Sequence, residues 1–117
     1  VGDNYHRKTL MGVPGRIEVA ALDGGWTLRN RIIWAKPTGV PSPVRTRLVN
    51  RHETILHLVR RKHDYYYDLQ AYVERYGEQP TDIWNVPLRP NSRNHLAPFP
   101  PELVERAITL ACPVSLC

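Results

Sequence analysis

The 117 residues of the chain are about the length of one small domain. Its 16 Lys and Arg residues outnumber its 11 Asp and Glu residues, and the formal net charge of +5 favours a polyanionic partner. No stretch approaches the roughly 18 apolar residues that cross a membrane, and the N-terminus has no signal-peptide pattern. We therefore expect no membrane segment.

The cysteines indicate the cellular compartment, and the first residue bears on whether the chain is part of a longer protein. Cys112 and Cys117 lie close together and are the only two cysteines, so they can build neither a disulfide framework nor a zinc knuckle. We therefore expect a reducing, cytoplasmic location. The sequence begins with Val1 rather than Met, which leads us to expect an internal fragment of a longer protein.

The first two predicted elements are a helix and a strand. In "MGVPGRIEVAALDGGW", Pro14 suits the first turn of a helix and Gly24-Gly25 end it. Polar and apolar residues then alternate over 26–36, up to Pro37. This alternation predicts a strand with one buried face, formed by Trp26, Leu28, Ile32 and Trp34.

A basic loop and a second strand follow. Residues 37–51 hold three prolines, one glycine and three arginines, which predicts an exposed loop. Residues 52–61 alternate, but both faces are apolar, as in a strand inside a sheet. We expect the strands over 26–36 and 52–61 to pair antiparallel across this basic loop.

The remaining segments alternate between extended and helical patterns. A tyrosine run leads into a predicted helix over 69–76, which Gly77 and Pro80 end, and "TDIWNVP" predicts a short strand or extended turn. A last helix runs from Pro100 or Pro101 to Ala111. Its predicted polar stripe is formed by Glu102, Glu105 and Arg106, and its apolar stripe by Leu103, Val104, Ala107, Ile108 and Ala111. The order of elements predicts a mixed α/β unit that is part of a larger sheet.

No catalytic or metal-binding spacing is visible in the residues, so we expect no catalytic residue and no metal. The histidines and cysteines lack His-x-x-x-His and Cys-x-x-Cys spacings, and no glycine-rich phosphate loop is present. Arg45, Arg47 and Arg51 lie within seven residues, and arginine binds phosphate in a bidentate manner. Contact with nucleic acid and simple solvation of the loop both stay open.

Five blocks in order carry a resemblance to a known family. They are "GDNY", "KTLMGVPGRIEVAALDGGWTLRNRIIWAKP", "RLVNRHETILHLVRRKHDYYYD", "DIWNVPLRP" and "NHLAPFPPELVERAITLACP". Together they resemble the site-specific DNA methyltransferases that modify an exocyclic amine, at adenine N6 or cytosine N4, in the subclass whose catalytic motif precedes its cofactor motif. The resemblance covers nearly the whole chain. It implies a partial N4/N6 methylase domain over 1–117, with a Rossmann-like α/β sheet.

The family's two main motifs are not among these 117 residues. Its catalytic Pro-Pro-Tyr/Trp motif lies upstream of the "GDNY" block, and its Asp-Pro-Phe-x-Gly-x-Gly motif for S-adenosylmethionine follows the "ACP" block. The last block runs beside the cofactor in the family, so the resemblance implies cofactor-side contacts at His95, Ala97, Phe99 and Pro100. The alternative is that Phe99 and the prolines only pack the entry of the last helix.

The resemblance also implies a double-stranded DNA partner for the basic loop. The residues that fall on the family's DNA-facing side are Lys36, Arg45, Arg47, Arg51 and His52. His52 and Glu53 could equally form a hydrogen-bonded pair that only anchors the loop. The family commonly has Trp where Gly15 stands here, which would leave a void if that position were buried.

The sequence as a whole therefore predicts part of an S-adenosylmethionine-dependent DNA amino-methyltransferase of a restriction-modification type. Such enzymes flip the target base out of the duplex to reach its amine. Because the two motifs are missing, we expect the isolated chain to be inactive without the remainder of the enzyme. The alternative is a stand-alone basic module that binds nucleic acid or pairs with a separate chain carrying the motifs.

Overall fold

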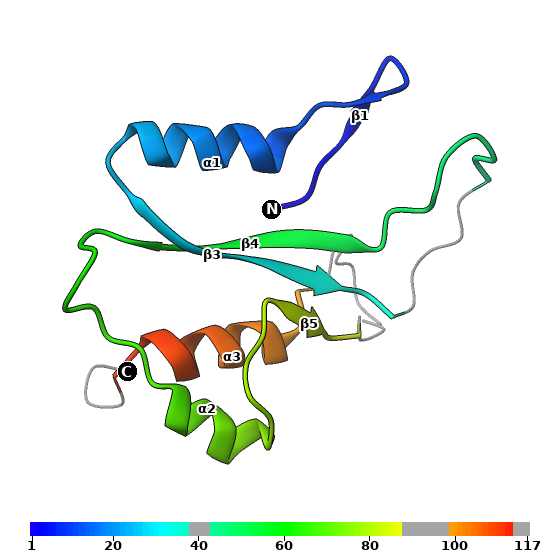
Figure 1. Cartoon of the computed structure of the whole chain (residues 1–117). Coiled ribbons are helices and arrows are strands. Elements are labelled where there is room, and N and C mark those ends of the chain that lie inside the picture. The colour runs from blue at the N-terminus through cyan, green and yellow to red at the C-terminus, as the bar shows by residue number, and fades with distance from the viewer. Residues whose placement is uncertain (38–42, 88–98, 114–117) are drawn as a thin grey trace.

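The computed structural model of the chain describes residues 1–37, 43–87 and 99–113. Two short strands, β1 (Tyr5–His6) and β2 (Thr9–Leu10), form an N-terminal hairpin before helix α1 (Val13–Asp23). Strands β3 (Thr27–Ala35) and β4 (His52–Val59) follow, then α2 (Leu69–Tyr76), β5 (Ile83–Asn85) and α3 (Pro101–Ala111). Figure 1 shows α1 on one side of the sheet, and α2 and α3 on the other.

The central sheet has the strand order β4-β3-β5 in the described residues. β3 and β4 pair antiparallel, from Thr27 opposite Val59 to Ala35 opposite His52, which confirms the predicted antiparallel pair. β5 pairs parallel with β3, which the sequence did not reveal. The sequence predicted that β4 lies inside a sheet, but within the described residues β4 is an edge strand. On its outer side, the Thr54 N–H donates a hydrogen bond to the Val1 carbonyl at 2.9 Å.

The predicted buried face of β3 holds only for the second half of the strand. Ile32 and Trp34 are buried, whereas Trp26 lies before the strand and is 36% exposed. The pairing register shifts between Leu28 and Asn30, so Arg29 is an extra residue without a partner on β4. One inserted residue turns every earlier side chain to the opposite face, which explains why Trp26 is exposed.

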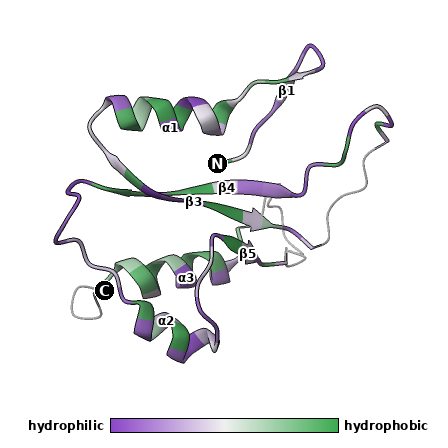
Figure 2. Ribbon diagram, in the orientation of Figure 1, coloured by the Kyte–Doolittle hydropathy of each residue, from purple (hydrophilic) through white to green (hydrophobic). Residues whose placement is uncertain are grey.

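The hydrophobic core lies between the sheet and the α2–α3 pair. Trp34 donates its indole N–H to the Val86 carbonyl at 2.7 Å, so this buried polar group is satisfied. Figure 2 shows hydrophobic and hydrophilic residues alternating on the helices, and mainly hydrophilic ones at the start of β4 and in the connection after it. The buried residues of this core cluster are Ile32, Trp34, Tyr72, Trp84, Val86, Leu103 and Leu110.

Helix α3 buries a different stripe from the predicted one. Leu103 and Leu110 are buried, whereas Val104 and Ile108 are 43% and 46% exposed. Arg106, expected on the polar face, has a side chain only 11% exposed. Its guanidinium carbon lies 4.5 Å from the ring centre of Tyr76, and cation–π contact stabilises a partly buried arginine.

The ends of the helices follow the expected local signals. Asp68 accepts a hydrogen bond from the Ala71 N–H at 2.9 Å and so caps the start of α2. Gly77 ends that helix with a φ of +74°, a conformation that glycine adopts without strain. Cys112, directly after α3, is disulfide-bonded, whereas the sequence led us to expect a reducing location and no disulfide framework.

Candidate nucleic-acid interface

The predicted DNA-facing residues gather at one end of the β3–β4 pair. The Lys36 N–H donates to the Arg51 carbonyl at 2.7 Å, which extends the strand pairing and closes the basic loop. Arg45, Arg47 and Arg51 are exposed on the described part of that loop, and His52 is exposed at the start of β4. The structure thus brings all five residues to the same end of the sheet.

Lys36 differs from the arginines because its charge is paired within the chain. Its ammonium lies 2.8 Å from the Glu53 carboxylate and 4.7 Å from the ring centre of Trp34. The side chain is only 22% exposed. The cations of the basic loop that are free to meet an external anion are therefore chiefly its arginines.

Arg47 is held against the N-terminal hairpin. Its guanidinium carbon lies 3.9 Å from the ring centre of Tyr5 in β1, which is close cation–π packing. A stacked guanidinium keeps the N–H donors on its edge free for a phosphate. Sequence reasoning did not single out Tyr5 as a contact residue, although it is the last residue of the "GDNY" block.

Asp3 of the same block anchors α1. Its carboxylate accepts hydrogen bonds from the N–H groups of Gly12 at 3.1 Å and Val13 at 3.2 Å, which otherwise lack partners at the helix start. Desolvation by burial raises the pKa of Asp3, but hydrogen bonds from Asn4, Val13 and Gly12 outweigh it and leave the pKa below its usual value. The block therefore fixes both the helix and the loop.

Of the cofactor-side residues expected from the resemblance, Phe99 and Pro100 are described, and His95 and Ala97 lie outside the described residues. The Phe99 ring meets Trp34 edge-on, with centroids 6.0 Å apart, and stays 62% exposed. Pro100 is buried where α3 begins. Because Lys36 also contacts Trp34, the two predicted groups of site residues meet at one tryptophan.

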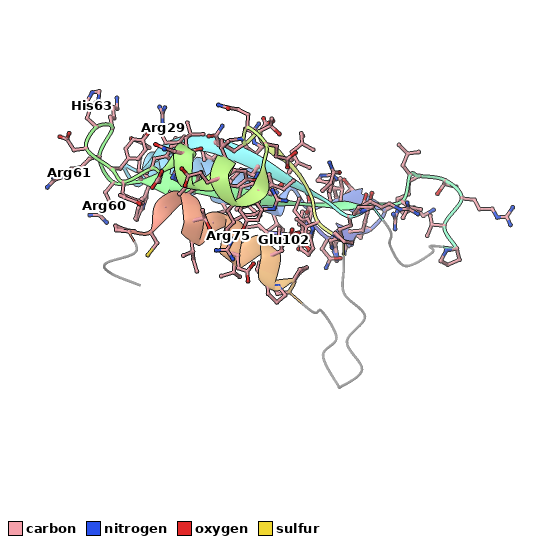
Figure 3. All side chains as sticks on the ribbon, turned by 90° about the horizontal axis from the view of Figure 1, so that it is seen from below. Arg29, Arg60, Arg61, His63, Arg75 and Glu102 are labelled. Carbon is pink, nitrogen blue, oxygen red and sulfur yellow. The ribbon has the colours of Figure 1, made fainter. Side chains whose placement is uncertain are left out.

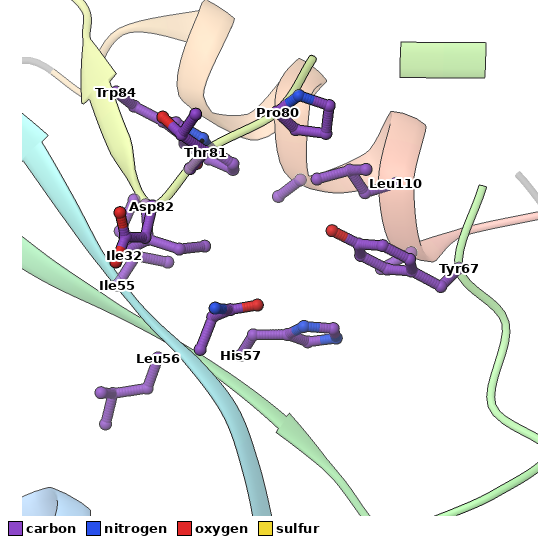
Figure 4. Close-up of a pocket in the computed structure, with 13 residues that line it drawn as sticks. Ile32, Ile55, Leu56, His57, Tyr67, Pro80, Thr81, Asp82, Trp84 and Leu110 are labelled. Atoms are coloured by element: carbon purple, nitrogen blue, oxygen red, sulfur yellow. Dashed lines mark hydrogen bonds between the residues drawn. The ribbon is translucent and has the colours of Figure 1, made fainter. Parts of the chain in front are cut away.

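A cavity of about 290 Å³ lies between the sheet and α3 (Figure 4). His57 and Tyr67 both line it and stack on each other, with ring centroids 5.6 Å apart and planes 19° apart. Burial, and then the charge of Arg29, lower the pKa of His57. The sequence signal for this pair was the tyrosine run, which we had interpreted only as an extended segment.

The described residues contain neither a cluster of metal ligands nor a helix that could span a membrane. Among residues 1–37, 43–87 and 99–113, no three His, Cys, Asp or Glu side chains are grouped closely enough to hold a metal ion. In the same ranges, no helix has the length and apolar character needed to cross a bilayer.

Comparison with known proteins gives consistent matches. The sequence profile of the N6/N4 methyltransferase family, described as "DNA methylase", matches residues 1–115. The Type II methyltransferase M.XycI of Xanthomonas campestris pv. cyanopsidis is 36% identical over 110 residues, which cover 86% of this chain and 35% of the relative.

Two further curated relatives carry the same description. The Type II methyltransferase M.Cfr9I of Citrobacter freundii is 35% identical over 105 residues, covering 86% of this chain and 35% of the relative. The Type II methyltransferase M.SmaI of Serratia marcescens is 38% identical over 99 residues, covering 80% and 34%. The chain thus spans about a third of the length of the curated relatives it matches.

Proposed function

The chain belongs to the N6/N4 DNA methylase family, and we propose that it is a segment of a site-specific DNA methyltransferase. The reaction is transfer of a methyl group from S-adenosylmethionine to an exocyclic amine, either adenine N6 or cytosine N4. The single observation that carries this proposal is the family match over residues 1–115. Relatives named as Type II methyltransferases support it.

In the complete enzyme, this segment supplies the β4-β3-β5 end of a Rossmann-like sheet. The mixture of one antiparallel and one parallel pair supports this proposal. Such sheets carry helices on both faces, and α1 lies on one side here while α2 and α3 lie on the other (Figure 1). Within the described residues β5 is an edge strand, and further strands of the complete enzyme add beside it.

The basic loop contacts the phosphates of double-stranded DNA. Arg45 and Arg51 make the direct contacts because both are exposed and no carboxylate in the described residues pairs with them. Arg47 contributes a guanidinium that Tyr5 already holds in place. Lys36 and His52 shape the base of the loop, Lys36 through its ion pair with Glu53.

Phe99 is the described residue that fits a cofactor contact. Its ring is 62% exposed and offers an apolar face to a planar group. Pro100 is buried, so it supports the entry of α3 rather than touching a ligand. His95 and Ala97 complete the proposed cofactor-side group. When bound, S-adenosylmethionine supplies the methyl group.

The test compares the isolated chain with the product of the complete reading frame that contains it. We expect the complete product to transfer labelled methyl groups from S-adenosylmethionine to duplex DNA, and the isolated chain to transfer none. Within the complete product, Arg45→Gln/Arg51→Gln should weaken DNA binding while leaving the cofactor affinity unchanged. Absence of transfer by the complete product would favour the binding-module alternative.

A further inference from the structure

A second basic surface lies at the opposite end of the β3–β4 pair from the basic loop. We call it the distal basic patch, and it is formed by Arg29, Arg60, Arg61, Lys62 and His63, all exposed. Figure 3 shows Arg29, Arg60, Arg61 and His63 gathered at one end of the molecule. Figure 1 shows the β4–α2 connection and the basic loop at opposite ends of the strands.

The charges of the distal basic patch are not neutralised within the described residues. The ion pairs there involve the cations of Arg31, Lys36, Arg75 and Arg106, and none of the patch. The stretch from Arg60 to Tyr67 holds one carboxylate, Asp64, against three Lys and Arg side chains. A cluster of unpaired, exposed cations creates a local positive potential that attracts anions.

Two arginines of the patch are held in place by aromatic rings. The guanidinium carbon of Arg60 lies 4.9 Å from the ring centre of Trp26, and that of Arg29 lies 5.7 Å from the ring centre of Tyr65. Arg29 is also the inserted residue of β3, and such bulges redirect a side chain. Stacking leaves the edge donors of each guanidinium available for a bidentate phosphate contact.

From these contacts we propose that the distal basic patch binds the phosphate backbone of nucleic acid, at a site separate from the basic loop. The nine residues of β3 are separated by eight steps of about 3.3 Å, so the two ends of the strand, where the two surfaces lie, are about 26 Å apart. This exceeds the screening length of about 8 Å at physiological salt, so the surfaces act independently. A duplex of about eight base pairs is long enough to reach both.

A guanidinium group held against an aromatic ring can donate two parallel hydrogen bonds to two oxygens of one phosphate. This geometry favours binding to individual phosphodiester groups over binding to a broad anionic surface. Contacts to phosphates do not distinguish one base sequence from another, so the patch binds duplexes of unrelated sequence with equal affinity. This proposal does not depend on methyl transfer. It concerns a binding contact at residues that the proposed function does not use.

The test uses Arg61→Gln/Lys62→Gln, because neither side chain has a hydrogen bond, ion pair or ring contact within the described residues. Their replacement therefore removes charge without removing a packing contact, and circular dichroism checks that the fold is kept. Binding of a labelled DNA duplex is measured by fluorescence anisotropy over a salt series, with two duplexes of unrelated sequence.

Each lost phosphate contact reduces the salt dependence of binding by about 0.9 in the slope of log K against log salt. We expect the double variant to lose about 1.8 in this slope, equally for both duplexes. The matched control is Arg75→Gln on α2, an exposed arginine whose charge is already paired with Glu105 at 3.4 Å. Its slope should equal that of the parent chain.

An unchanged slope in the Arg61→Gln/Lys62→Gln variant overturns the proposal, as does an equal loss in the Arg75→Gln control. The loop variant Arg45→Gln/Arg51→Gln, measured in the same series, separates the two surfaces. If only the loop variant loses slope, the patch proposal fails and the DNA contact of the loop stands. If only the patch variant loses slope, the patch stands and the proposed role of the loop fails.

Discussion

The ring of Phe99 lies edge-on to the ring of Trp34, with centroids 6.0 Å apart. Trp34 is 3% exposed and also contacts the Lys36 ammonium. It therefore holds Lys36, just before the basic loop, and Phe99, two residues before α3, against the same side chain. The proposed DNA-facing and cofactor-side segments are therefore joined by a core residue. A substitution that displaces Trp34 from either segment can therefore shift the position of the other segment.

Phe99→Ala should lower the free energy of unfolding by about 0.5–1.5 kcal/mol, the range for an edge-on aromatic pair. The larger cost of a core truncation is not expected, because Phe99 is 62% exposed. Urea unfolding measures the change. The matched control is Leu48→Ala, an apolar side chain 88% exposed, which should leave stability unchanged. Equal effects of the two variants would contradict the Phe99–Trp34 contact.

Tyr5→Leu should weaken the attachment of the basic loop to the N-terminal hairpin. The lost cation–π contact with Arg47 is worth about 0.5–1 kcal/mol at an exposed position. Urea unfolding of the variant measures this loss. Tyr5→Phe keeps the aromatic face and should retain the stability of the parent, so a loss of the same size in Tyr5→Phe would argue against ring stacking.

Gly15→Ala should stabilise the chain by about 0.5–1 kcal/mol, because alanine is the better helix former. Gly15 lies in the first turn of α1, and an added Cβ would meet nothing within 4 Å. The open space also shows that the position is not a buried void. Thermal melting measures the gain, and a lower melting temperature would contradict this interpretation.

Gly12→Ala is the contrasting variant for the same helix. Gly12 has a φ of +72°, which alanine adopts only with strain, although the space around it is equally open. It should destabilise the chain by about 1–2 kcal/mol. Opposite signs for the two glycines would confirm that backbone conformation, rather than space, decides each effect.

The stability of the chain should fall as the pH drops below about 6.5. Burial, and then the charge of Arg29, hold the folded pKa of His57 below its ordinary value of 6.5. As the pH falls, His57 therefore binds a proton in the unfolded state before it does so in the folded state. The free energy of unfolding declines from about pH 6.5 down to the folded pKa and is constant below it. The free energy of unfolding of His57→Gln, measured with urea at a series of pH values, should lack this part of the decline.

Arg29→Gln tests whether the charge of Arg29 contributes to the low pKa of His57. Removing the nearby positive charge should raise the pKa of His57 toward its ordinary value, because less repulsion opposes protonation. Proton NMR titration of the imidazole measures this shift directly. A pKa of His57 that does not rise in Arg29→Gln would show that burial alone lowers it.

Local signals in the sequence were enough to predict most elements. Pro14, Gly24 and Gly77 mark helix ends that depend on the conformations of single residues, and the structure keeps them. The strand pair over 27–35 and 52–59 followed from residue alternation on both sides of a proline-rich loop. These features depend on neighbours in the chain, which is why they can be recognised without a structure.

The failed predictions depend on contacts between distant residues. The inserted residue Arg29 reverses the faces of β3, and no local pattern marks it. Arg106 is drawn into the α2–α3 interface by the rings of Tyr72 and Tyr76, so a charge pattern alone assigns it wrongly to solvent. The parallel pairing of β5 with β3 joins segments about fifty residues apart.

In the candidate site, too, features of local sequence could be predicted and contacts between distant residues could not. The basic loop was identified from its composition, because a proline-rich stretch followed by clustered arginines is visible in the sequence. Its attachment to Tyr5 and the convergence of Lys36 and Phe99 on Trp34 were not predicted, because they require the tertiary fold. In the distal basic patch, Arg60, Arg61, Lys62 and His63 are consecutive in the sequence, and only the addition of Arg29 depends on the fold, through the bulge in β3.

The most direct test of the central claim is to sequence the DNA on both sides of the region that encodes this chain and translate it in all frames. The account predicts a Pro-Pro-Tyr/Trp motif upstream and an Asp-Pro-Phe-x-Gly-x-Gly motif downstream, which would make this chain a segment of an amino-methyltransferase. Start and stop signals that bound these 117 residues directly would contradict it and leave a binding or split-enzyme role.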